Sequence, residues 1–320
     1  MKTIAVLTSG GDAPGMNAAI RAVVRAGISM GLNVKGIRRG YAGLIEGDII
    51  DMDARSVSDI IHRGGTMLYT ARCPEFKTQE GVDKAIASCK AHGIDGIVVI
   101  GGDGSFRGAR DLSLGGIPCI GVPGTIDNDI SSTEYTIGYD TAINTALEMA
   151  DKLRDTAQSH DRCSVVEVMG RRAGYLALQT GIACGAIAIL VPEVEFDLNK
   201  DVIEKIKAVH KTGKKHFVVV VAEGVGGVTR IAEEIEEATG IESRATILGH
   251  VQRGGVPTAR DRVMASQMGY RAVELLSQGI GNRVITFVDN QLGDKDIYEA
   301  LAMTKKFDIE EYNMATAISI

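Results

Sequence analysis

The feature that most constrains the fold is a series of short, continuous runs of Val, Ile and other apolar residues along the chain. The runs occupy residues 4–7, 34–37, 97–100, 119–122, 165–168, 187–191, 217–222 and 284–288. Their apolar residues are continuous and do not alternate with polar ones, as in strands that are buried on both faces of a parallel sheet. We therefore expect a mostly parallel sheet that is covered on both faces.

Segments with helical periodicity separate these runs. They occupy residues 17–30, 81–92, 141–156, 200–211, 231–239, 260–278 and 296–303. Alternation of strands and helices over the whole length predicts a doubly wound α/β architecture. The 320 residues suffice for two domains. No stretch has the composition of a linker, so chain crossings within compact structure must make any division into domains.

Composition excludes several classes of function. Hydrophobic residues make up 45% and charged residues 24%, and the net charge of −6 argues against bulk binding of nucleic acid or of an anionic membrane. The N-terminal apolar run is too short for a signal peptide, and no window has the ~18 apolar residues of a membrane span, so we expect a cytoplasmic protein. The cysteines are odd in number and far apart, which indicates neither a disulfide framework nor a Cys-x-x-Cys metal site.

Three glycine-rich turns follow predicted strands. In the first, residues 8–17, Gly10 and Gly11 allow backbone amides to approach an anion at a helix N-terminus. The chain contains neither a G-x-G-x-x-G nor a G-x-x-x-x-G-K-[ST] pattern, which disfavours a dinucleotide oxidoreductase and excludes the usual P-loop enzyme. In the second turn, residues 101–105, the glycines suit a backbone cradle for phosphates and Asp103 suits a divalent cation.

The third turn, residues 121–129, places Thr125, Asp127 and Asp129 directly after a buried strand. Each turn alone could be a simple capped turn, because glycine and Asp are common turn residues. Three such turns at the carboxyl ends of strands would gather at one edge of a sheet, where open α/β sheets bind ligands. Together they favour a phosphoryl-transfer site, which works by positioning the reactants and neutralising charge.

Five motifs in order resemble the bacterial ATP-dependent 6-phosphofructokinases, and the similarity covers essentially the whole chain. The motifs are Ser9-Gly10-Gly11-Asp12-x-Pro14-Gly15-Met16-Asn17, Gly101-Gly102-Asp103-Gly104-Ser105, Pro123-Gly124-Thr125-Ile126-Asp127-Asn128-Asp129, Val168-Met169-Gly170-Arg171 and Gly249-His250-x-Gln252-Arg253-Gly254-Gly255. The resemblance implies phosphorylation of fructose 6-phosphate at its 1-hydroxyl by ATP, the committed step of glycolysis, with Mg²⁺ and allosteric regulation. It implies an ATP-binding domain of residues 1–138 plus 251–301, a sugar-phosphate domain of residues 139–250 plus 302–320, and an active site in the cleft between them.

The resemblance assigns roles to residues. Asp127 would be the general base, a task that typically gives ~10²–10⁴ in rate, with Asp129, Arg72, Thr125 and Arg171 as the other catalytic residues. Asp103 would bind Mg²⁺. The ATP site would comprise Gly11, Arg72, Cys73, Gly102, Asp103, Gly104 and Ser105. The substrate site would comprise Thr125, Ile126, Asp127, Arg162, Met169, Gly170, Arg171, Glu223, Arg244, His250, Val251, Gln252 and Arg253.

The resemblance also implies an assembly. Arg162 and Arg244 would come from the neighbouring subunit of a homotetramer, so that oligomerisation is part of the active site. Pyrophosphate-dependent relatives typically carry an acid at the position of Gly104 and a Lys at that of Gly124. Both positions are Gly here, which favours ATP over the alternative, a pyrophosphate-dependent phosphofructokinase. A catalytically silent nucleotide-binding regulatory subunit is a further alternative, although it predicts loss of the acid at 103 or 127, and both are present.

A second site is implied for small phosphorylated effectors. Its residues would be Arg21, Ala22, Val23, Val24, Arg25, Arg55, Asp59, Arg154, Gly185, Ala186, Ile187, Lys214, Lys215 and His216. Ile187 stands where the family commonly has a Glu that helps to hold the Mg²⁺ of ADP, and Thr212 stands where an Arg is usual. Arg172 and Tyr175 also depart from the common pattern. We therefore predict weak activation by ADP, with phosphoenolpyruvate still able to bind the remaining cations.

Overall fold

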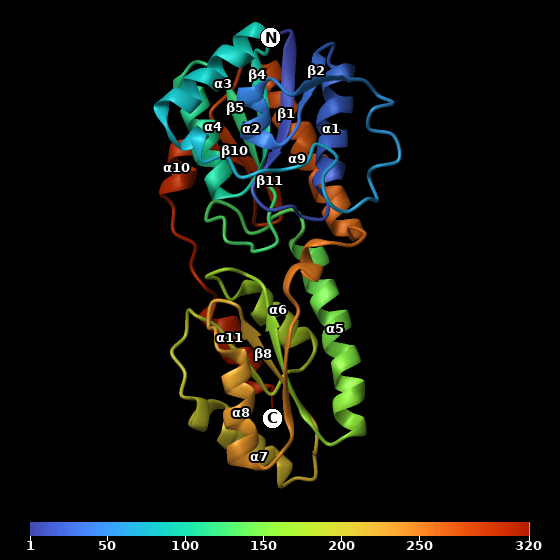
Figure 1. Cartoon of the computed structure of the whole chain (residues 1–320), viewed down its shortest axis with the longest axis vertical. Coiled ribbons are helices and arrows are strands. Elements are labelled where there is room, and N and C mark those ends of the chain that lie inside the picture. The colour runs from blue at the N-terminus through green and yellow to red at the C-terminus, as the bar shows by residue number, and fades with distance from the viewer. Residues whose placement is uncertain (320) are drawn as a thin grey trace. The chain divides into compact units, whose positions relative to one another are not determined.

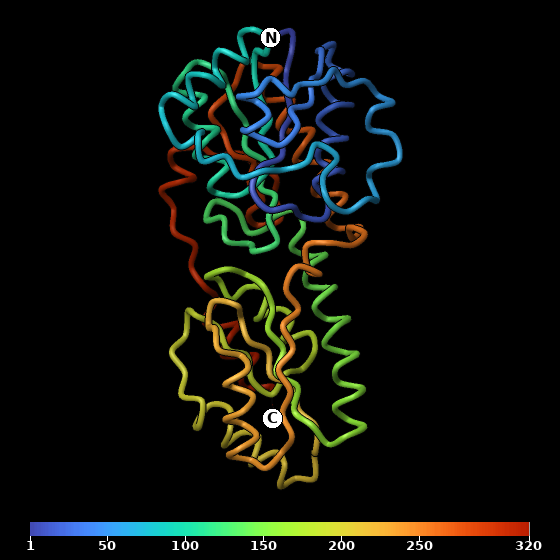
Figure 2. Tube along the Cα trace, in the orientation of Figure 1, coloured from blue at the N-terminus to red at the C-terminus, as the bar shows by residue number. Residues whose placement is uncertain are grey.

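The computed structural model describes residues 1–319, and these form two compact units. The first unit comprises residues 1–126, 130–141 and 253–305, and the second comprises residues 127–129, 142–252 and the chain from residue 306 onward. The chain crosses between the units several times, as the trace in Figure 2 shows. The domain boundaries predicted at residues 138, 250 and 301 remain a prediction. The assignment of ATP to one domain and of the sugar phosphate to the other also remains a prediction.

The first unit is built on a mixed seven-stranded sheet with the order β11-β10-β5-β4-β1-β2-β3. The five inner strands run parallel, and the edge strands β3 and β11 run antiparallel to their neighbours. The strands are β1 (Thr3–Ser9), β2 (Asn33–Ile37), β3 (Ile49–Met52), β4 (Gly96–Gly101), β5 (Cys119–Pro123), β10 (Arg283–Val288) and β11 (Gln291–Asp296). Every residue of β4 and β5 is buried, which explains their continuous apolar sequences.

Helices cover both faces of this sheet. On one face α1 (Met16–Ser29) and α9 (Ala259–Ser277) pack against each other, as Figure 1 shows. On the other face a core of residues such as Leu7, Val99 and Phe106 lies under the remaining helices of the unit. These are α2 (Gly40–Glu46), the short 3₁₀ helix η1 (Glu75–Lys77), α3 (Gln79–Ala91), α4 (Asp103–Leu114) and α10 (Ile297–Ala302).

The second unit has a four-stranded sheet with the order β7-β8-β6-β9, and all its strands are parallel. The strands are β6 (Cys163–Val168), β7 (Ala188–Leu190), β8 (Phe217–Ala222) and β9 (Ser243–Ile247). One face packs on a core under the π-helical turn η2 (Asn199–Ile203), α7 (Glu204–His210) and α8 (Val228–Thr239). The other helices are α5 (Tyr139–Ser159), α6 (Tyr175–Ala183), η3 (Gly249–Arg253) and α11 (Ile309–Ala317).

Local chemistry sets several helix boundaries. Thr78, Asp296 and Asp308 stand just before α3, α10 and α11, and each side chain accepts a hydrogen bond from a backbone N–H of the first turn. Gly227 and Gly240 flank α8 with positive φ angles of 67° and 72°, which glycine adopts without strain.

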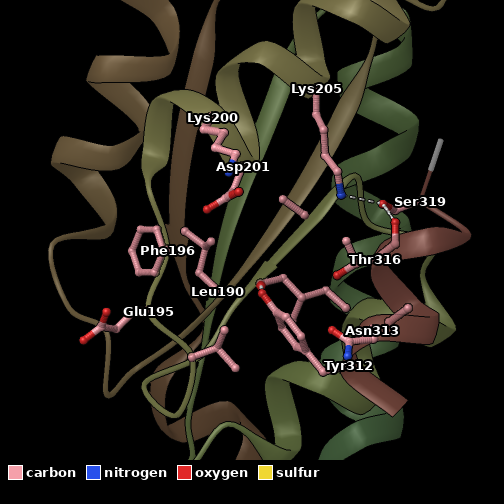
Figure 3. A pocket seen from close by; sticks show the side chains of 14 residues that line it. Leu190, Glu195, Phe196, Lys200, Asp201, Lys205, Tyr312, Asn313, Thr316 and Ser319 are labelled. Carbon is pink, nitrogen blue, oxygen red and sulfur yellow. Dashed lines mark hydrogen bonds between the residues drawn. The ribbon is translucent and has the colours of Figure 1, made fainter. Parts of the chain in front are cut away.

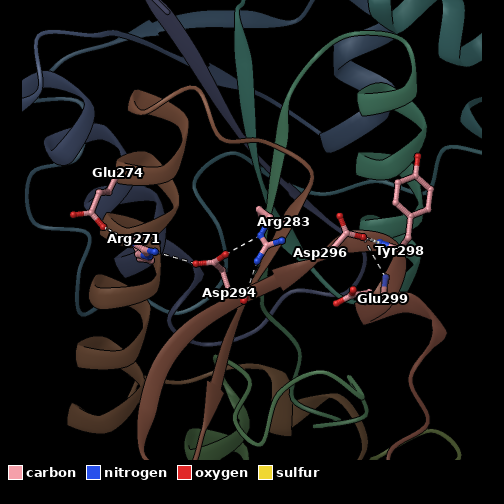
Figure 4. A network of polar contacts seen from close by, with 7 residues as sticks. All are labelled: Arg271, Glu274, Arg283, Asp294, Asp296, Tyr298 and Glu299. Carbon is pink, nitrogen blue, oxygen red and sulfur yellow. Dashed lines mark hydrogen bonds and ion pairs between the residues drawn. The ribbon is translucent and has the colours of Figure 1, made fainter.

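A polar network fastens the antiparallel hairpin β10–β11 to α9 (Figure 4). Asp294 on β11 accepts from Arg283 Nε at 2.7 Å and from Arg271 Nη2 of α9 at 3.0 Å. Arg271 also pairs with Glu274, one turn further along the same helix. Burial alone would raise the pKa of the Asp294 carboxyl. Hydrogen bonds and charges from Arg283 and Arg271 outweigh that effect, and the pKa is lowered. The edge of the sheet is therefore held by charge pairing and not only by apolar packing.

All eight predicted strands and all seven predicted helices are present, and the α/β class is confirmed. The prediction missed β3, β9 and β11, and it missed α2, α4, α6 and α11. β9 and β11 contain polar, partly exposed residues and do not form apolar runs. Residues 101–105 are not a separate turn, because β4 ends at Gly101 and α4 begins at Asp103. Among residues 1–319, no helix combines the length and the apolar character needed to span a bilayer.

Candidate active site

The carboxyl ends of three neighbouring strands in the first unit are level with one another. In the register of the sheet, Ser9 of β1 is opposite Gly101 of β4, and Gly101 is opposite Pro123 of β5. The three glycine-rich segments that follow these strands therefore begin side by side, as the sequence predicts. This edge of a parallel sheet is where open α/β proteins bind their ligands.

Hydrogen bonds hold the segments together. Ser105 Oγ donates to the Ser9 carbonyl at 3.0 Å, and the Gly124 N–H donates to the Gly101 carbonyl at 3.0 Å. A Cβ at Gly102 or at Gly104 would meet no atom within 4 Å, so open space adjoins the first turn of α4 at both positions. Asp103 lies between these glycines at the first position of the helix. A helix N-terminus beside open space suits a phosphate group.

Gly11 lies against an arginine from the far end of the sequence. Arg253 Nη1 donates to the Asp12 carbonyl at 3.0 Å, and a Cβ at Gly11 would stand 2.5 Å from that same nitrogen. A residue predicted for the ATP site and one predicted for the sugar site therefore meet in the first unit. Thr70 Oγ1 donates to the Gly10 carbonyl at 2.7 Å, which brings the segment that ends in the exposed Arg72 and half-buried Cys73 to the first turn.

The predicted base has charged neighbours in the second unit. The side chain of Asp127 is only 3% exposed, and its Oδ2 lies 3.8 Å from Arg171 Nε. Arg171 Nη1 lies 3.9 Å from Asp129 Oδ2, so one guanidinium adjoins both carboxylates. Gly170 and Arg171 have φ angles of 140° and 56°. This backbone turn after β6 also lets the Arg171 N–H donate to Glu223 Oε2 at 3.2 Å.

A buried amide supports the same loop. Gln252 is fully buried, its Oε1 accepts from the Met169 N–H at 3.2 Å, and its Nε2 donates to the Gly249 carbonyl at 3.1 Å. His250 and Val251 beside it are exposed. The segments after β6, β8 and β9 thus meet at the carboxyl edge of the second sheet, where Gln252 is buried and His250 is exposed.

Two predicted substrate arginines lie at the other end of this sheet. Arg162 immediately precedes β6, and Arg244 stands early in β9, opposite Ser164. Arg162 lies seven residues before Met169, a separation of roughly 20 Å along a strand. Arg162 and Arg244 therefore do not join Asp127 and Arg171 in one site of the same chain.

Glu242 accepts hydrogen bonds from both of these arginines, and the sequence did not predict it as a site residue. Its Oε2 accepts from Arg162 Nε at 2.7 Å, and its Oε1 accepts from Arg244 Nε at 2.9 Å. Hydrogen bonds from Arg162 and then Arg244 lower the pKa of Glu242. Its spacing of two from Arg244 puts both on one face of a strand, but only the pairing of β6 with β9 brings Arg162 beside them.

Several other residues predicted for the sites are buried in the protein interior. Ile126 is fully buried, and the Thr125 carbonyl accepts from Thr136 Oγ1 at 2.6 Å. Within the effector set, Val23 and Val24 are fully buried, and Ile187 is 1% exposed. The side chains of these three residues pack in cores and offer no polar group to a ligand.

The remaining effector residues divide between the two units. Arg21, Ala22 and Arg25 lie on α1, and Arg55 and Asp59 lie in the segment after β3. In the second unit, Arg154 on α5 has a buried Nη2 without a hydrogen-bond partner, and its charge acts on the thiol of Cys184, beside Gly185 and Ala186. Lys214, Lys215 and His216 precede β8, and Lys215 Nζ lies 3.5 Å from Asp161.

A glycine-lined helix N-terminus in the first unit, and two carboxylates beside one arginine in the second, are features expected of an α/β enzyme that handles phosphate groups. Residues 3–276 match the family described as Phosphofructokinase. The chain is 59% identical over 319 residues to the ATP-dependent 6-phosphofructokinase of Clostridium botulinum and 58% identical over 320 residues to that of Bacillus cytotoxicus, with 100% of each chain covered. It is also similar to the structure of phosphofructokinase from Saccharomyces cerevisiae, with 35% identity and a TM-score of 0.89 over 100% of this chain and 48% of that one. The chain belongs to the phosphofructokinase family.

Proposed function

We propose that the chain is an ATP-dependent 6-phosphofructokinase. It transfers the γ-phosphoryl group of ATP to the 1-hydroxyl of fructose 6-phosphate and releases fructose 1,6-bisphosphate and ADP. The observation that carries this proposal is full-length identity of 58–59% to enzymes of that name. The acids at 103 and 127 are retained, which disfavours a catalytically silent subunit. As an enzyme of glycolysis it would act in the cytoplasm.

ATP is proposed to bind at the carboxyl edge of the first sheet. The open space beside Gly102 and Gly104 accepts the phosphates, and the amides at the start of α4 donate to them. Gly11, Ser105, Arg72 and Cys73 complete the set. Asp103 is suited to hold Mg²⁺, because this ion takes one or two protein carboxylates together with substrate phosphates. When bound, Mg²⁺ would neutralise charge on those phosphates.

Asp127 is proposed to take the proton from the 1-hydroxyl as that oxygen attacks the γ-phosphorus. Its burial shields it from water, and the nearby Arg171 would add positive charge beside the transferring group. Asp129 Oδ2 lies 3.9 Å from the same guanidinium. Thr125 and Ile126 position the loop through their backbone, and Arg72 adds positive charge at the donor.

The sugar phosphate is proposed to bind at the carboxyl edge of the second sheet, where Met169, Gly170, Glu223, His250 and Val251 are gathered. Arg162 and Arg244 are at the opposite edge, so they are proposed to reach the 6-phosphate of a neighbouring chain. Arginine forks suit phosphate recognition. The proposed assembly is a homotetramer with closed two-fold symmetry, in which each substrate site is completed by a second copy.

Regulation by small phosphorylated molecules is also proposed. The cations Arg21, Arg25, Arg154, Lys214 and Lys215 can bind a phosphate group, and the buried Nη2 of Arg154 supports this proposal. Ile187 is buried and cannot replace a missing carboxylate, and Thr212 Oγ1 is already bonded to the Val209 carbonyl at 2.7 Å. We therefore propose phosphoenolpyruvate as a better effector than Mg-ADP.

A donor-swap assay tests the proposed function. The purified protein is supplied with fructose 6-phosphate, Mg²⁺ and either ATP or pyrophosphate, and formation of fructose 1,6-bisphosphate is measured. We expect product with ATP and at least ~10²-fold less with pyrophosphate, a difference of roughly 2.7 kcal/mol in transition-state stabilisation. Comparable rates with both donors would favour the pyrophosphate-dependent alternative, and no product with either would refute the kinase assignment.

A further inference from the structure

A pocket in the second unit is lined by none of the residues predicted for the active or effector sites. It lies between the edge strand β7, the helical segment η2–α7 and the C-terminal helix α11, and its volume is about 240 Å³ (Figure 3). Pockets for drug-sized ligands begin near ~300 Å³, so the occupant is a smaller molecule.

One side of the pocket is apolar. Leu190 and Ile189 of β7, Phe196 and the ring of Tyr312 line it, as Figure 3 shows for the labelled members. Tyr312 Oη donates to the Ile189 carbonyl at 3.1 Å, which covers part of the unpaired edge of β7 and fixes the ring. This wall suits a compact hydrocarbon group.

The other side carries a half-buried cation. Lys205 Nζ donates to Ser319 Oγ at 3.0 Å, and Ser319 Oγ donates to the Thr316 carbonyl at 2.7 Å. Within the described chain, residues 1–319, no carboxylate forms an ion pair with Lys205. Burial lowers the pKa of this ammonium, and the charge of Asp201 opposes that shift. The ammonium retains N–H groups for an oxygen of a ligand.

An anion lines the same pocket and is not paired with that cation. Asp201 lies one helical turn before Lys205, and its Oδ2 accepts from the Asp197 N–H at 2.7 Å. No cation of residues 1–319 forms an ion pair with it. Burial first, and then the charge of Asp201, raise the pKa of Tyr312, so that charge acts within the pocket. The pocket is lined by two cations, Lys200 and Lys205, and by two anions, Glu195 and Asp201. Lys205 is the half-buried one, and the other three are exposed. The lining therefore offers charges of both signs in equal number.

We propose that this pocket binds a free α-amino acid with an apolar side chain. The carboxylate of the ligand pairs with Lys205, its ammonium pairs with Asp201, and its side chain lies on Leu190, Phe196 and Tyr312. A zwitterion fits better than a ligand with a single charge. A simple anion would leave Asp201 without a partner and would be repelled by it, and a simple cation would do the same at Lys205.

Three probes of one shape test the charge requirement on the full chain. Leucine carries both charges, 4-methylpentanoate lacks the ammonium, and 3-methylbutylamine lacks the carboxylate. We expect saturable binding of leucine by ligand-observed NMR and at least ~10-fold weaker binding of each analogue. An analogue that binds as tightly as leucine would refute the zwitterion, and absence of saturable leucine binding up to about 10 mM would refute the site.

Matched variants locate the binding. Lys205→Met keeps the length of the side chain, and Asp201→Asn keeps an acceptor for the Asp197 N–H. Each is expected to weaken leucine binding at least ~10-fold. The exposed Lys207, which does not line the pocket, serves as the control, and Lys207→Met is expected to bind as the parent does. Melting temperatures check that the variants are folded. Folded variants at 205 and 201 with unchanged affinity would place the ligand elsewhere and overturn the proposal.

Discussion

Asp127 and Asp129 are two residues apart in the chain and share one arginine, yet their surroundings differ. The side chain of Asp127 is 3% exposed and that of Asp129 is 31% exposed. A buried carboxylate is shielded from bulk water and is suited to move a proton, whereas a partly exposed one acts mainly through its charge. This difference in exposure agrees with the proposed roles, in which Asp127 is the base and Asp129 acts through its charge.

Replacing the base tests this division. Asp127→Ser is expected to lower kcat at least ~10²-fold with a modest change in KM, because a general base acts in the transition state. Steady-state kinetics with ATP and fructose 6-phosphate measure both constants. Asp51→Ser is the control, since the side chain of Asp51 is 88% exposed and its surface ion pair adds little stability. A near-normal kcat for Asp127→Ser contradicts the role.

Gly104 tests the choice of phosphoryl donor. Gly104→Asp places a carboxylate in the open space beside the proposed phosphate cradle and is expected to raise the KM for ATP at least ~10-fold by charge repulsion. Gly104→Ala fills part of that space without charge and is the control. Equal KM values for the two variants would show that charge at this position does not matter. Gly124→Lys is a poorer test, because its Cβ would stand 3.0 Å from Ile100 and 3.3 Å from Met16.

At the scale of elements, α4 and the hairpin β10–β11 show how context overrides local pattern. α4 contains Gly104 and Gly108, which lower its helix propensity. Glycines also precede it, so its first turn reads in the sequence as part of a glycine-rich turn. Gly108 is required all the same, because a Cβ there would lie 2.7 Å from the ring of Tyr41. β11 is polar and is held through Asp294, whose partners are on β10 and α9.

The hairpin network predicts a pH dependence of stability. The folded pKa of Asp294 is lowered, so its contribution is present above the unfolded value of ~3.9 and is lost as the pH falls through the folded value. Asp294→Asn is expected to lower the free energy of unfolding by about 1.5–3 kcal/mol at pH 7 and by less below pH ~3.5. Urea unfolding at both pH values measures this. Asp289→Asn, an exposed change on the same hairpin, is the control. An equal deficit at both pH values contradicts the linkage.

At the scale of the whole molecule, the proposed tetramer predicts complementation between inactive variants. Asp127→Ser and Arg162→Ser are each expected to be nearly inactive. If Arg162 serves a neighbouring site, subunits mixed by co-refolding restore about a quarter of the sites, each with both residues intact. The specific activity of the mixture, compared with that of the separately refolded variants, measures this. A mixture with no more activity than its components contradicts sharing between subunits.

The effector proposal also belongs to this scale. Mg-ADP is expected to activate the enzyme less than about 2-fold at low fructose 6-phosphate, because Ile187 is buried and supplies no ligand to the metal. Titration with Mg-ADP and with phosphoenolpyruvate at fixed substrate concentrations measures both effects. Ile187→Glu is unsuitable as a gain-of-function variant, since it would place a charge in the core. Several-fold activation by Mg-ADP contradicts the prediction.

The sequence by itself determined the α/β class, because buried parallel strands must be continuous apolar runs, and such runs are visible without a structure. It also indicated the phosphate cradle and the acids at 103, 127 and 129, because their chemistry depends on short local spacing. Tertiary structure alone decided which distant residues meet. It placed Arg253 against Gly11, brought Arg162, Glu242 and Arg244 together, and joined Lys205 to Ser319. Such contacts depend on strand pairing and helix packing between segments far apart in the chain, which no local pattern of residues records.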